Sequence, residues 1–185
     1  MRKVIAAINM TLDGFCDHTA VIADDELHEH YTDLLKSADT ILYGRVTYQL
    51  MEYWRAVVEN PTGNKSVDEF AVTMDKIPKI VFSKTLKTVE WKTARLAKRE
   101  LKEEVLELKQ SSNGGSKNIL AGSPGLIVAL TNLNLIDEFQ ICVQPIVSGG
   151  GLPLFKNINE RINLKFLKTI THASGSIILY YNIVS

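Results

Sequence analysis

Thr40-Ile-Leu-Tyr-Gly-Arg-Val-Thr-Tyr48 decides the fold, because an apolar run passes through one glycine directly into a helix-forming segment, Gln49-Leu-Met-Glu-Tyr-Trp54. A glycine at such a junction permits a tight turn and a close approach of the backbone to a ligand. The free N–H groups of the first helical turn face outward at the positive end of the helix dipole. The junction therefore predicts a phosphate site.

Arg45 and Thr47 add the side chains that such a site uses. The Arg45 guanidinium is a permanent cation with a planar fork, and the Thr47 hydroxyl can cap the helix or donate to a phosphate oxygen. An ordinary strand-to-helix turn with a solvated arginine is the alternative, and for this short motif alone it is the better reading. The interpretation therefore depends on what the rest of the chain supplies.

A second junction of this kind follows the short apolar run Asn118-Ile-Leu-Ala121. It consists of Gly122-Ser-Pro-Gly125, in which Pro124 suits a first helical turn and Ser123 suits the capping position before it. A third apolar run ends at Phe82 in Ser83-Lys84. Together these sites would suit a long ligand with several phosphates, such as a dinucleotide, although the G-x-G-x-x-G fingerprint is absent.

The first apolar run, Val4 to Met10, lacks polar alternation, which is typical of a strand buried on both faces. It ends in the turn Thr11-Leu-Asp-Gly14. Asn9, Thr11 and Asp13 are therefore expected near the carboxyl end of a central strand, where open α/β sheets bind ligands. A plain turn is the alternative reading of Asp13-Gly14.

Further segments complete an α/β pattern that ends in antiparallel strands, so a mixed sheet with helices on both faces is expected. The segments are a helix from 24 to 36, a short helix at 67–74, a short edge strand within 89–95, a helix at 96–109, a turn at 111–116, a strand at 139–147, a glycine loop at 148–151 and a hairpin at 162–184.

Length and composition favour one compact domain over residues 1–185, with 45% hydrophobic and 23% charged residues. The formal net charge of +0 gives no general attraction to nucleic acid or to an anionic membrane. The N-terminal apolar run is too short for a signal peptide, and no run reaches membrane-spanning length. A cytoplasmic protein is expected.

Cysteine and histidine spacing does not indicate a metal site. Cys16 and Cys142 form no C-x-x-C motif and are expected to be free thiols. His28 and His30 are two residues apart, so they diverge on a helix, and we expect both to lie on the surface.

Several motifs in order resemble the reductase domain of the riboflavin-biosynthesis deaminase-reductases, within the dihydrofolate reductase superfamily. They cover nearly the whole chain and are Thr11-Leu-Asp-Gly14, Gly44-Arg-Val-Thr-Tyr48, Val81-Phe-Ser83, Leu120-Ala-Gly122, Leu135-Ile-Asp-Glu138, and Pro145 through Gly149-Gly-Gly-Leu-Pro-Leu-Phe155.

The resemblance implies a dihydrofolate reductase-like, three-layer α/β/α fold with a mixed, largely parallel sheet and a C-terminal antiparallel hairpin. It also implies an NADPH-dependent reductase that forms a homodimer. The implied cofactor residues are Ala7, Gly44, Arg45, Thr47, Ser83, Lys84, Gly122 and Ser123, with Ser83 and Lys84 near the 2′-phosphate. Asn9, Thr11, Gly149 and Gly150 would border the substrate, and Asp13 would orient it or relay a proton.

Departures from the family pattern narrow this expectation. His28 or a close neighbour stands where a folate-reducing enzyme carries its pterin-binding carboxylate, which disfavours folate reduction. Gln49 replaces the usual Glu, and Ala121 replaces the first glycine of a Gly-Gly pair. The zinc deaminase signature is missing. No further cation cluster offers to bind a sugar phosphate, so another small carbonyl or imine substrate competes with the riboflavin precursor.

Two readings without turnover stay open beside the reductase. One is a nucleotide-binding homodimer that keeps the cofactor turns, and the other is a structural dimer in which the turns are vestigial. Binding of NADPH without its oxidation distinguishes the first from an enzyme, and the second predicts no NADPH affinity.

Overall fold

The computed structural model describes residues 2–111 and 117–184, so most of the turn predicted at 111–116 lies outside the described residues. The strands are β1 (Val4–Thr11), β2 (Ala38–Gly44), β3 (Lys79–Phe82), β4 (Ala94–Leu96), β5 (Asn118–Ala121), β6 (Glu138–Gln144), β7 (Leu164–Thr171) and β8 (Ile177–Ile183). The helices are α1 (Asp25–Lys36), α2 (Arg45–Met51), α3 (Tyr53–Glu59), α4 (Lys65–Lys76), α5 (Leu101–Gln110) and α6 (Pro124–Asn132).

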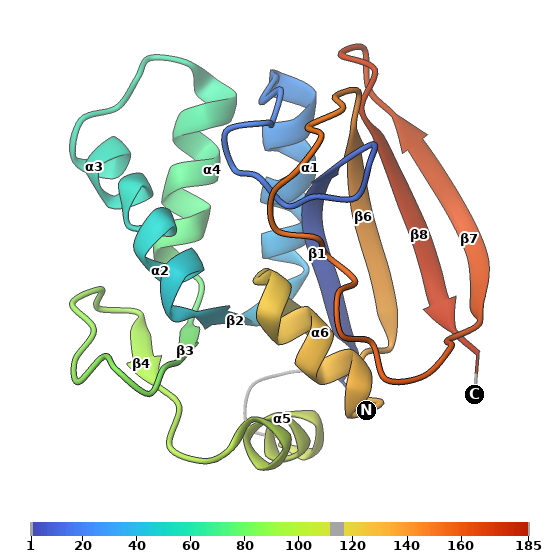
Figure 1. The fold of residues 1–185 in the computed structure, drawn as a ribbon. Helices are drawn as coiled ribbons and strands as arrows, with labels where there is room; N and C mark the ends of the chain where they lie inside the picture. The colour runs from blue at the N-terminus through green and yellow to red at the C-terminus, as the bar shows by residue number, and fades with distance from the viewer. Residues whose placement is uncertain (1, 112–116, 185) are drawn as a thin grey trace.

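All the strands listed above join one sheet in the order β4-β3-β2-β5-β1-β6-β8-β7 (Figure 1). The pairs from β4 through β6 are parallel, for example Ile5 beside Leu120 and Ala6 beside Phe139. Strand β8 runs antiparallel to both β6 and β7. The mixed, largely parallel sheet with a C-terminal antiparallel hairpin is therefore confirmed.

Strand β1 shows why the first apolar run lacks polar alternation. Val4, Ala6 and Ile8 pack into a core with residues of α5 and α6 on one face of the sheet. Ile5 faces the opposite way, into a second core built with α1 and α4. Both faces of this strand are thus dry, and the helices form a layer on each side of the sheet (Figure 1).

Polar side chains cap the N-termini of two of these helices. The Asp24 carboxylate accepts a hydrogen bond from the Leu27 N–H at 2.8 Å at the start of α1. The Asn64 side chain accepts from the Ser66 and Val67 N–H groups at the start of α4. Such caps satisfy amide groups that have no partner within the helix.

The boundaries differ from prediction around β4 and α5. The helix predicted from Leu96 begins only at Leu101, because Leu96 pairs with Val81 as the last residue of β4. Trp91, expected in the edge strand, lies before it and is buried. Its indole Nε1 donates to the Asp75 carboxylate at 2.6 Å.

His28 and His30 are half-buried, so the surface position predicted for them is confirmed only in part. The His28 ring lies edge-on to Trp54 and Phe70, at 5.9 and 5.8 Å between ring centroids. His30 packs against Tyr180 of the C-terminal hairpin. Burial, followed by the nearby His172 and Lys168, lowers the pKa of His30 to about 4. Contacts from distant segments cover part of each ring.

Cys16 and Cys142 are free thiols, as predicted. Burial raises the pKa of each to about 11, so neither is a reactive thiolate at neutral pH. Within the described residues, every helix is too short or too polar to cross a lipid bilayer.

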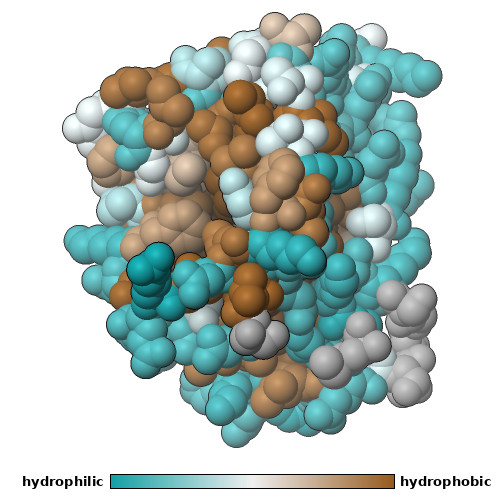
Figure 2. All heavy atoms as spheres, turned by 90° about the vertical axis from the view of Figure 1, so that its right-hand side faces the viewer, coloured by the Kyte–Doolittle hydropathy of each residue, from teal (hydrophilic) through white to brown (hydrophobic). Residues whose placement is uncertain are grey.

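The hairpin β7–β8 carries an uncovered apolar area. Figure 2 views the side of the molecule that carries β7 and shows hydrophobic side chains gathered beside a wide polar surface. Phe166 is 55% exposed and stands opposite Tyr181 in the ladder. Leu164, Leu167 and Ile177 are exposed as well.

Candidate cofactor and substrate site

A cavity of about 760 Å³ lies at the carboxyl ends of β1, β2 and β5 and reaches α1, α2 and α4. Ligands of open α/β sheets bind at this edge. Seven of the predicted site residues line the cavity: Ala7, Asn9, Gly44, Arg45, Thr47, Gly122 and Ser123. The first strand and both strand-to-helix junctions therefore meet at one cavity.

The two junctions are joined by a hydrogen bond. Strands β2 and β5 are parallel neighbours, so the chain leaves both at the same sheet edge. There the Gly44 N–H donates to the Ser123 hydroxyl oxygen at 2.9 Å. Ser123 occupies the capping position of α6, as predicted, but its side chain makes no hydrogen bond to that helix. The first-turn amides of α6 therefore stay available to a ligand.

Gly122 is required by close packing. A Cβ atom at this position would lie 3.1 Å from the Cε1 atom of Tyr43. The Tyr43 ring is buried, and its hydroxyl contacts the Met74 sulfur at 3.5 Å. Burial raises the pKa of Tyr43, which keeps the phenol neutral. At this part of the cavity lining, Gly122 thus packs directly against the fixed ring of Tyr43.

Asn9 is oriented by a buried glutamine that sequence reasoning missed. Gln144, with no exposed surface, donates through Nε2 to the Asn9 side-chain oxygen at 3.1 Å. The Gln144 oxygen accepts from the Ile22 N–H at 3.1 Å, which fixes which way the amide faces. The Asn9 amide nitrogen is thereby the end of the side chain left for a ligand.

Asp13 lies outside the cavity lining and holds two loops together. Its carboxylate accepts from the Thr11 hydroxyl at 2.6 Å and from the amides of Ser148 and Gly149 at 3.1 and 2.7 Å. These bonds, that of Thr11 first, lower its pKa to about 2. Asp13 is thus an ionised carboxylate with its oxygens engaged, which favours a loop-holding role over the predicted proton relay.

The other predicted substrate residues take part in the same loop contact. Thr11 is buried and also accepts from the Phe15 N–H at 3.0 Å. Gly149 adopts a φ of +73°, which suits glycine. Neither they nor Gly150 line the cavity, whereas Leu152 from the same glycine loop does. The loop therefore borders the cavity through an apolar side chain.

Ser83 and Lys84 lie one strand further along the same edge. They follow Phe82, which pairs with Gly44, but they do not line the cavity. The Ser83 hydroxyl accepts from the amides of Thr85 and Leu86 at 3.1 and 2.9 Å. Lys84 is exposed. They form a turn with an exposed cation at the same edge of the sheet as the two junctions.

One part of the cavity lining is an aromatic cluster, and its residues were missed as site residues. Trp54 and Phe70 meet edge to face at 4.6 Å, and His28 touches both rings. All three line the cavity with Leu27 and Tyr31. One signal was available: His28 shares a helical face with Tyr31 and Leu35, which the apolar spacing already assigned to the interior.

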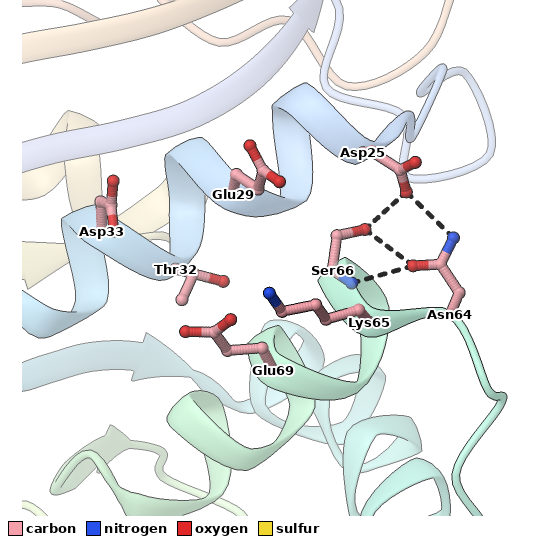
Figure 3. A pocket seen from close by; sticks show the side chains of 8 residues that line it. All are labelled: Asp25, Glu29, Thr32, Asp33, Asn64, Lys65, Ser66 and Glu69. Atoms are coloured by element: carbon pink, nitrogen blue, oxygen red, sulfur yellow. Dashed lines mark hydrogen bonds between the residues drawn. The ribbon is translucent and has the colours of Figure 1, made fainter.

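A second hollow of about 400 Å³ between α1 and α4 is acidic (Figure 3). The Asp25 carboxylate there accepts from the Ser66 hydroxyl at 2.6 Å and from the Asn64 amide at 2.9 Å. Glu69 pairs with Lys36 at 2.5 Å. Within the described part of the chain, no group of three or more His, Cys, Asp or Glu is placed to hold a metal ion. We interpret the hollow as a contact between α1 and α4 that is made by charged and polar side chains.

A sheet of this order with a cavity at its parallel carboxyl edge is typical of α/β proteins that bind ligands there. The model of the RibD C-terminal domain family matches residues 2–178, and the chain belongs to this family.

Relatives extend over the whole chain. The Bacillus subtilis protein YyaP, itself described as uncharacterized, is 34% identical over 98% of this chain and 95% of its own. A Shewanella sp. PV-4 structure, named provisionally as a riboflavin biosynthesis protein, is 20% identical with a TM-score of 0.74 and 99% of each chain covered.

A third comparison is with a Thermotoga maritima protein described as a diaminohydroxyphosphoribosylaminopyrimidine deaminase/5-amino-6-(5-phosphoribosylamino)uracil reductase. It is 13% identical with a TM-score of 0.64, and the match covers 99% of this chain and 57% of that one. These two solved structures establish a shared fold.

Proposed function

We propose that this protein is an NADPH-dependent reductase of a small carbonyl or imine substrate, of which a riboflavin-type aminopyrimidine is one candidate. The observation that carries the proposal is the hydrogen bond between the two glycine junctions, which line a cavity that an aromatic cluster also lines. The junctions offer helix amides and Arg45 to phosphates, and the aromatic cluster offers an apolar surface to a ring.

The residues present fit a dinucleotide. Gly122 lines the cavity with no side chain of its own, and the Ser123 side chain leaves the first-turn amides of α6 free. Arg45 lines the cavity next to Thr47, and Ser83 and Lys84 follow along the same edge, where a 2′-phosphate would distinguish NADPH from NADH. When bound, NADPH would supply a hydride.

The chain's own contribution is to position the reactants and exclude water. Leu27, Tyr31 and Trp54 give the substrate an apolar wall, and the Asn9 amide, held by Gln144, offers one oriented polar group. A hydride from the bound cofactor would add to the carbon of a C=O or C=N group, and a proton from solvent would go to its oxygen or nitrogen. The reaction thus needs no buried acid.

A binding protein without turnover is the second candidate. It is supported by the position of Asp13, which lies outside the cavity with its carboxylate engaged. Loss of absorbance at 340 nm, followed over a panel of cyclic imines, aminopyrimidines and small carbonyls, separates the two. Substrate-dependent oxidation of NADPH is expected. Tight NADPH binding with no oxidation over the panel would favour the binding protein.

We further propose that two copies associate through the β7–β8 hairpin. β7 is an edge strand, so among the described residues no strand pairs with its outer side, and Phe166 within it is exposed. An uncovered apolar area beside a strand edge is a surface that a second identical copy can bury.

A further inference from the structure

We propose that the aromatic cluster of the cavity lining binds a flat, uncharged heterocycle without a phosphate group, and that the Nε2 atom of His28 accepts a hydrogen bond from an N–H in the plane of that ring. This inference rests on the proposed function and names the substrate class for the same cavity. It also assigns a binding role to His28.

The neighbours of His28 hold its ring at the cavity wall. The imidazole is half-buried on α1 and meets Trp54 and Phe70 edge-on. Trp54 comes from α3 and Phe70 from α4, so three helices fix the position of one ring. A polar ring held among apolar partners in a cavity wall can orient a ligand at small entropic cost.

A hydrogen bond to the backbone determines which ring nitrogen is free. The Nδ1 atom of His28 lies 2.9 Å from the carbonyl oxygen of Asp24. A carbonyl oxygen only accepts, so Nδ1 carries the proton and Nε2 of the neutral ring presents a lone pair. No residue in the described ranges hydrogen-bonds to Nε2. A ligand N–H would satisfy this acceptor.

The surroundings of His28 favour a flat ring over a sugar phosphate. Apolar side chains, among them Leu27, Tyr31 and Trp54, line the cavity together with His28. Arg45 follows Gly44 at the first junction, and the described lining residues include no other arginine and no lysine. A phosphate placed beside Trp54 would lose its hydration without gaining a cation, which is costly. A planar ring would instead stack or pack edge-on against the aromatic side chains.

The test uses Trp54 fluorescence, which does not depend on turnover. The protein has two tryptophans, and Trp91 is 2% exposed and outside the cavity. With NADP⁺ present, the protein is titrated with 5-aminouracil and, separately, with uridine 5′-monophosphate, which carries its pyrimidine on a ribose phosphate. We expect 5-aminouracil to quench the fluorescence at a dissociation constant at least about tenfold lower than that of the nucleotide, and Trp54→Phe to abolish the quench.

Variants at His28 test the hydrogen bond. His28→Phe keeps an aromatic ring but removes the acceptor, so it should weaken 5-aminouracil binding about three- to tenfold. His28→Gln places an acceptor near the Nε2 position and should restore most of the affinity. His30→Gln, two residues along the same helix and outside the cavity, is the matched control and should bind as the parent does.

The inference is overturned by equal or tighter binding of the nucleotide, or by unchanged 5-aminouracil affinity in His28→Phe. A thermal shift with NADP⁺ but no quench by 5-aminouracil would also overturn it, while leaving the cofactor assignment standing. If 5-aminouracil quenches the fluorescence, His28→Phe weakens its binding and His28→Gln restores it, but neither NADP⁺ nor NADPH gives a thermal shift, the proposed heterocycle site is supported. The same result would exclude the proposed reductase function.

Discussion

The Gly44 N–H donates to the Ser123 hydroxyl at 2.9 Å across two neighbouring strand ends, and this bond holds the two helix-starting turns in one fixed arrangement. Residues 79 positions apart in sequence thereby form one surface. The Ser123 hydroxyl accepts from Gly44 and does not cap its own helix. The bond therefore links the stability of the fold to the shape of the cavity.

Ser123→Ala should therefore lower both stability and NADPH affinity. It leaves the half-buried Gly44 N–H without its partner, which costs about 1 kcal/mol of unfolding free energy. Ser66→Ala is a suitable comparison, because it removes a 2.6 Å bond to Asp25 far from the junctions. Urea denaturation should show loss in both variants, and a thermal titration should show weaker NADPH binding in Ser123→Ala alone. Equal NADPH affinity in the two would argue against the linkage.

Gly122→Ala should destabilise the protein, because the new methyl group would lie 3.1 Å from Tyr43 Cε1 and the buried ring has little room to move. We expect a loss of about 1 to 3 kcal/mol. Gly125→Ala, in the first turn of α6, meets nothing within 4 Å and should be neutral or stabilising by up to about 1 kcal/mol. Calorimetric midpoints of the two variants should move apart. Identical midpoints would mean that the Tyr43 ring moves easily to accommodate the added methyl group.

Asp13→Asn tests whether this residue holds loops or transfers protons. The amide loses one acceptor atom, so the contacts to Ser148 and Gly149 weaken and the glycine loop should become more sensitive to limited proteolysis. NADPH affinity should stay the same, and any reductase activity should fall by less than about tenfold. A fall of about 10²-fold or more, typical of losing a general acid, would restore the proton-relay role.

Lys79 should make stability depend on pH. Burial lowers its pKa from 10.5 to about 7. Between these values the unfolded chain holds a proton that the folded chain has released, so the unfolding free energy rises with pH across this window. Lys79→Met should remove that slope, and the exposed Lys76→Met should keep it. Urea unfolding of each variant from pH 7 to 9.5 measures the difference, and a slope equal to the parent's in Lys79→Met would exclude this cause.

The hydrogen bonds around Lys79 act in the opposite sense to burial. Its ammonium lies 2.8 Å from the Ile77 carbonyl and 2.9 Å from the Thr93 hydroxyl, and 3.9 Å from the centre of the Trp91 ring. Asp75 nearby also favours the charged form. These contacts reduce the slope but not its sign, because burial remains the largest effect.

Phe166→Glu should prevent dimer formation if the β7–β8 hairpin joins two copies. A carboxylate in a dry interface costs far more than it does on a free surface. Lys168→Glu, on the same strand but with its ammonium over the Tyr180 ring, is a charge control. Sedimentation velocity should give a dimer for the parent and a monomer for Phe166→Glu. A monomeric parent would contradict the proposal.

The sheet could be predicted because its signals are local. Buried strands such as β1 are unbroken apolar runs in the sequence, and a glycine at the end of an apolar run marks each junction, at Gly44 and at Gly122. The start of α5 was placed too early because Leu96 suits either a strand or a helix, and only its pairing with Val81 decides between them.

The site was predicted only in part, because its decisive contacts join distant segments. Ser123 suited a helix cap, and nothing local shows that Gly44 would take its hydroxyl. Asp13 was assigned to chemistry from its place after β1, whereas the glycine loop occupies its carboxylate. His28 was expected on the surface because Trp54 and Phe70, which cover it, come from other helices.

The central claim is that the joined junctions bind NADPH, and the direct measurement is the thermal stability of the purified protein titrated with NADPH and, separately, NADH. A ligand that binds only the folded state adds about 2.7 kcal/mol at one hundred times its dissociation constant. Arg45→Ala and Lys84→Ala run beside the exposed controls Arg161→Ala and Lys102→Ala. We predict a larger shift with NADPH than with NADH, which shrinks in Arg45→Ala and Lys84→Ala and persists in both controls. No shift with either nucleotide would contradict the account.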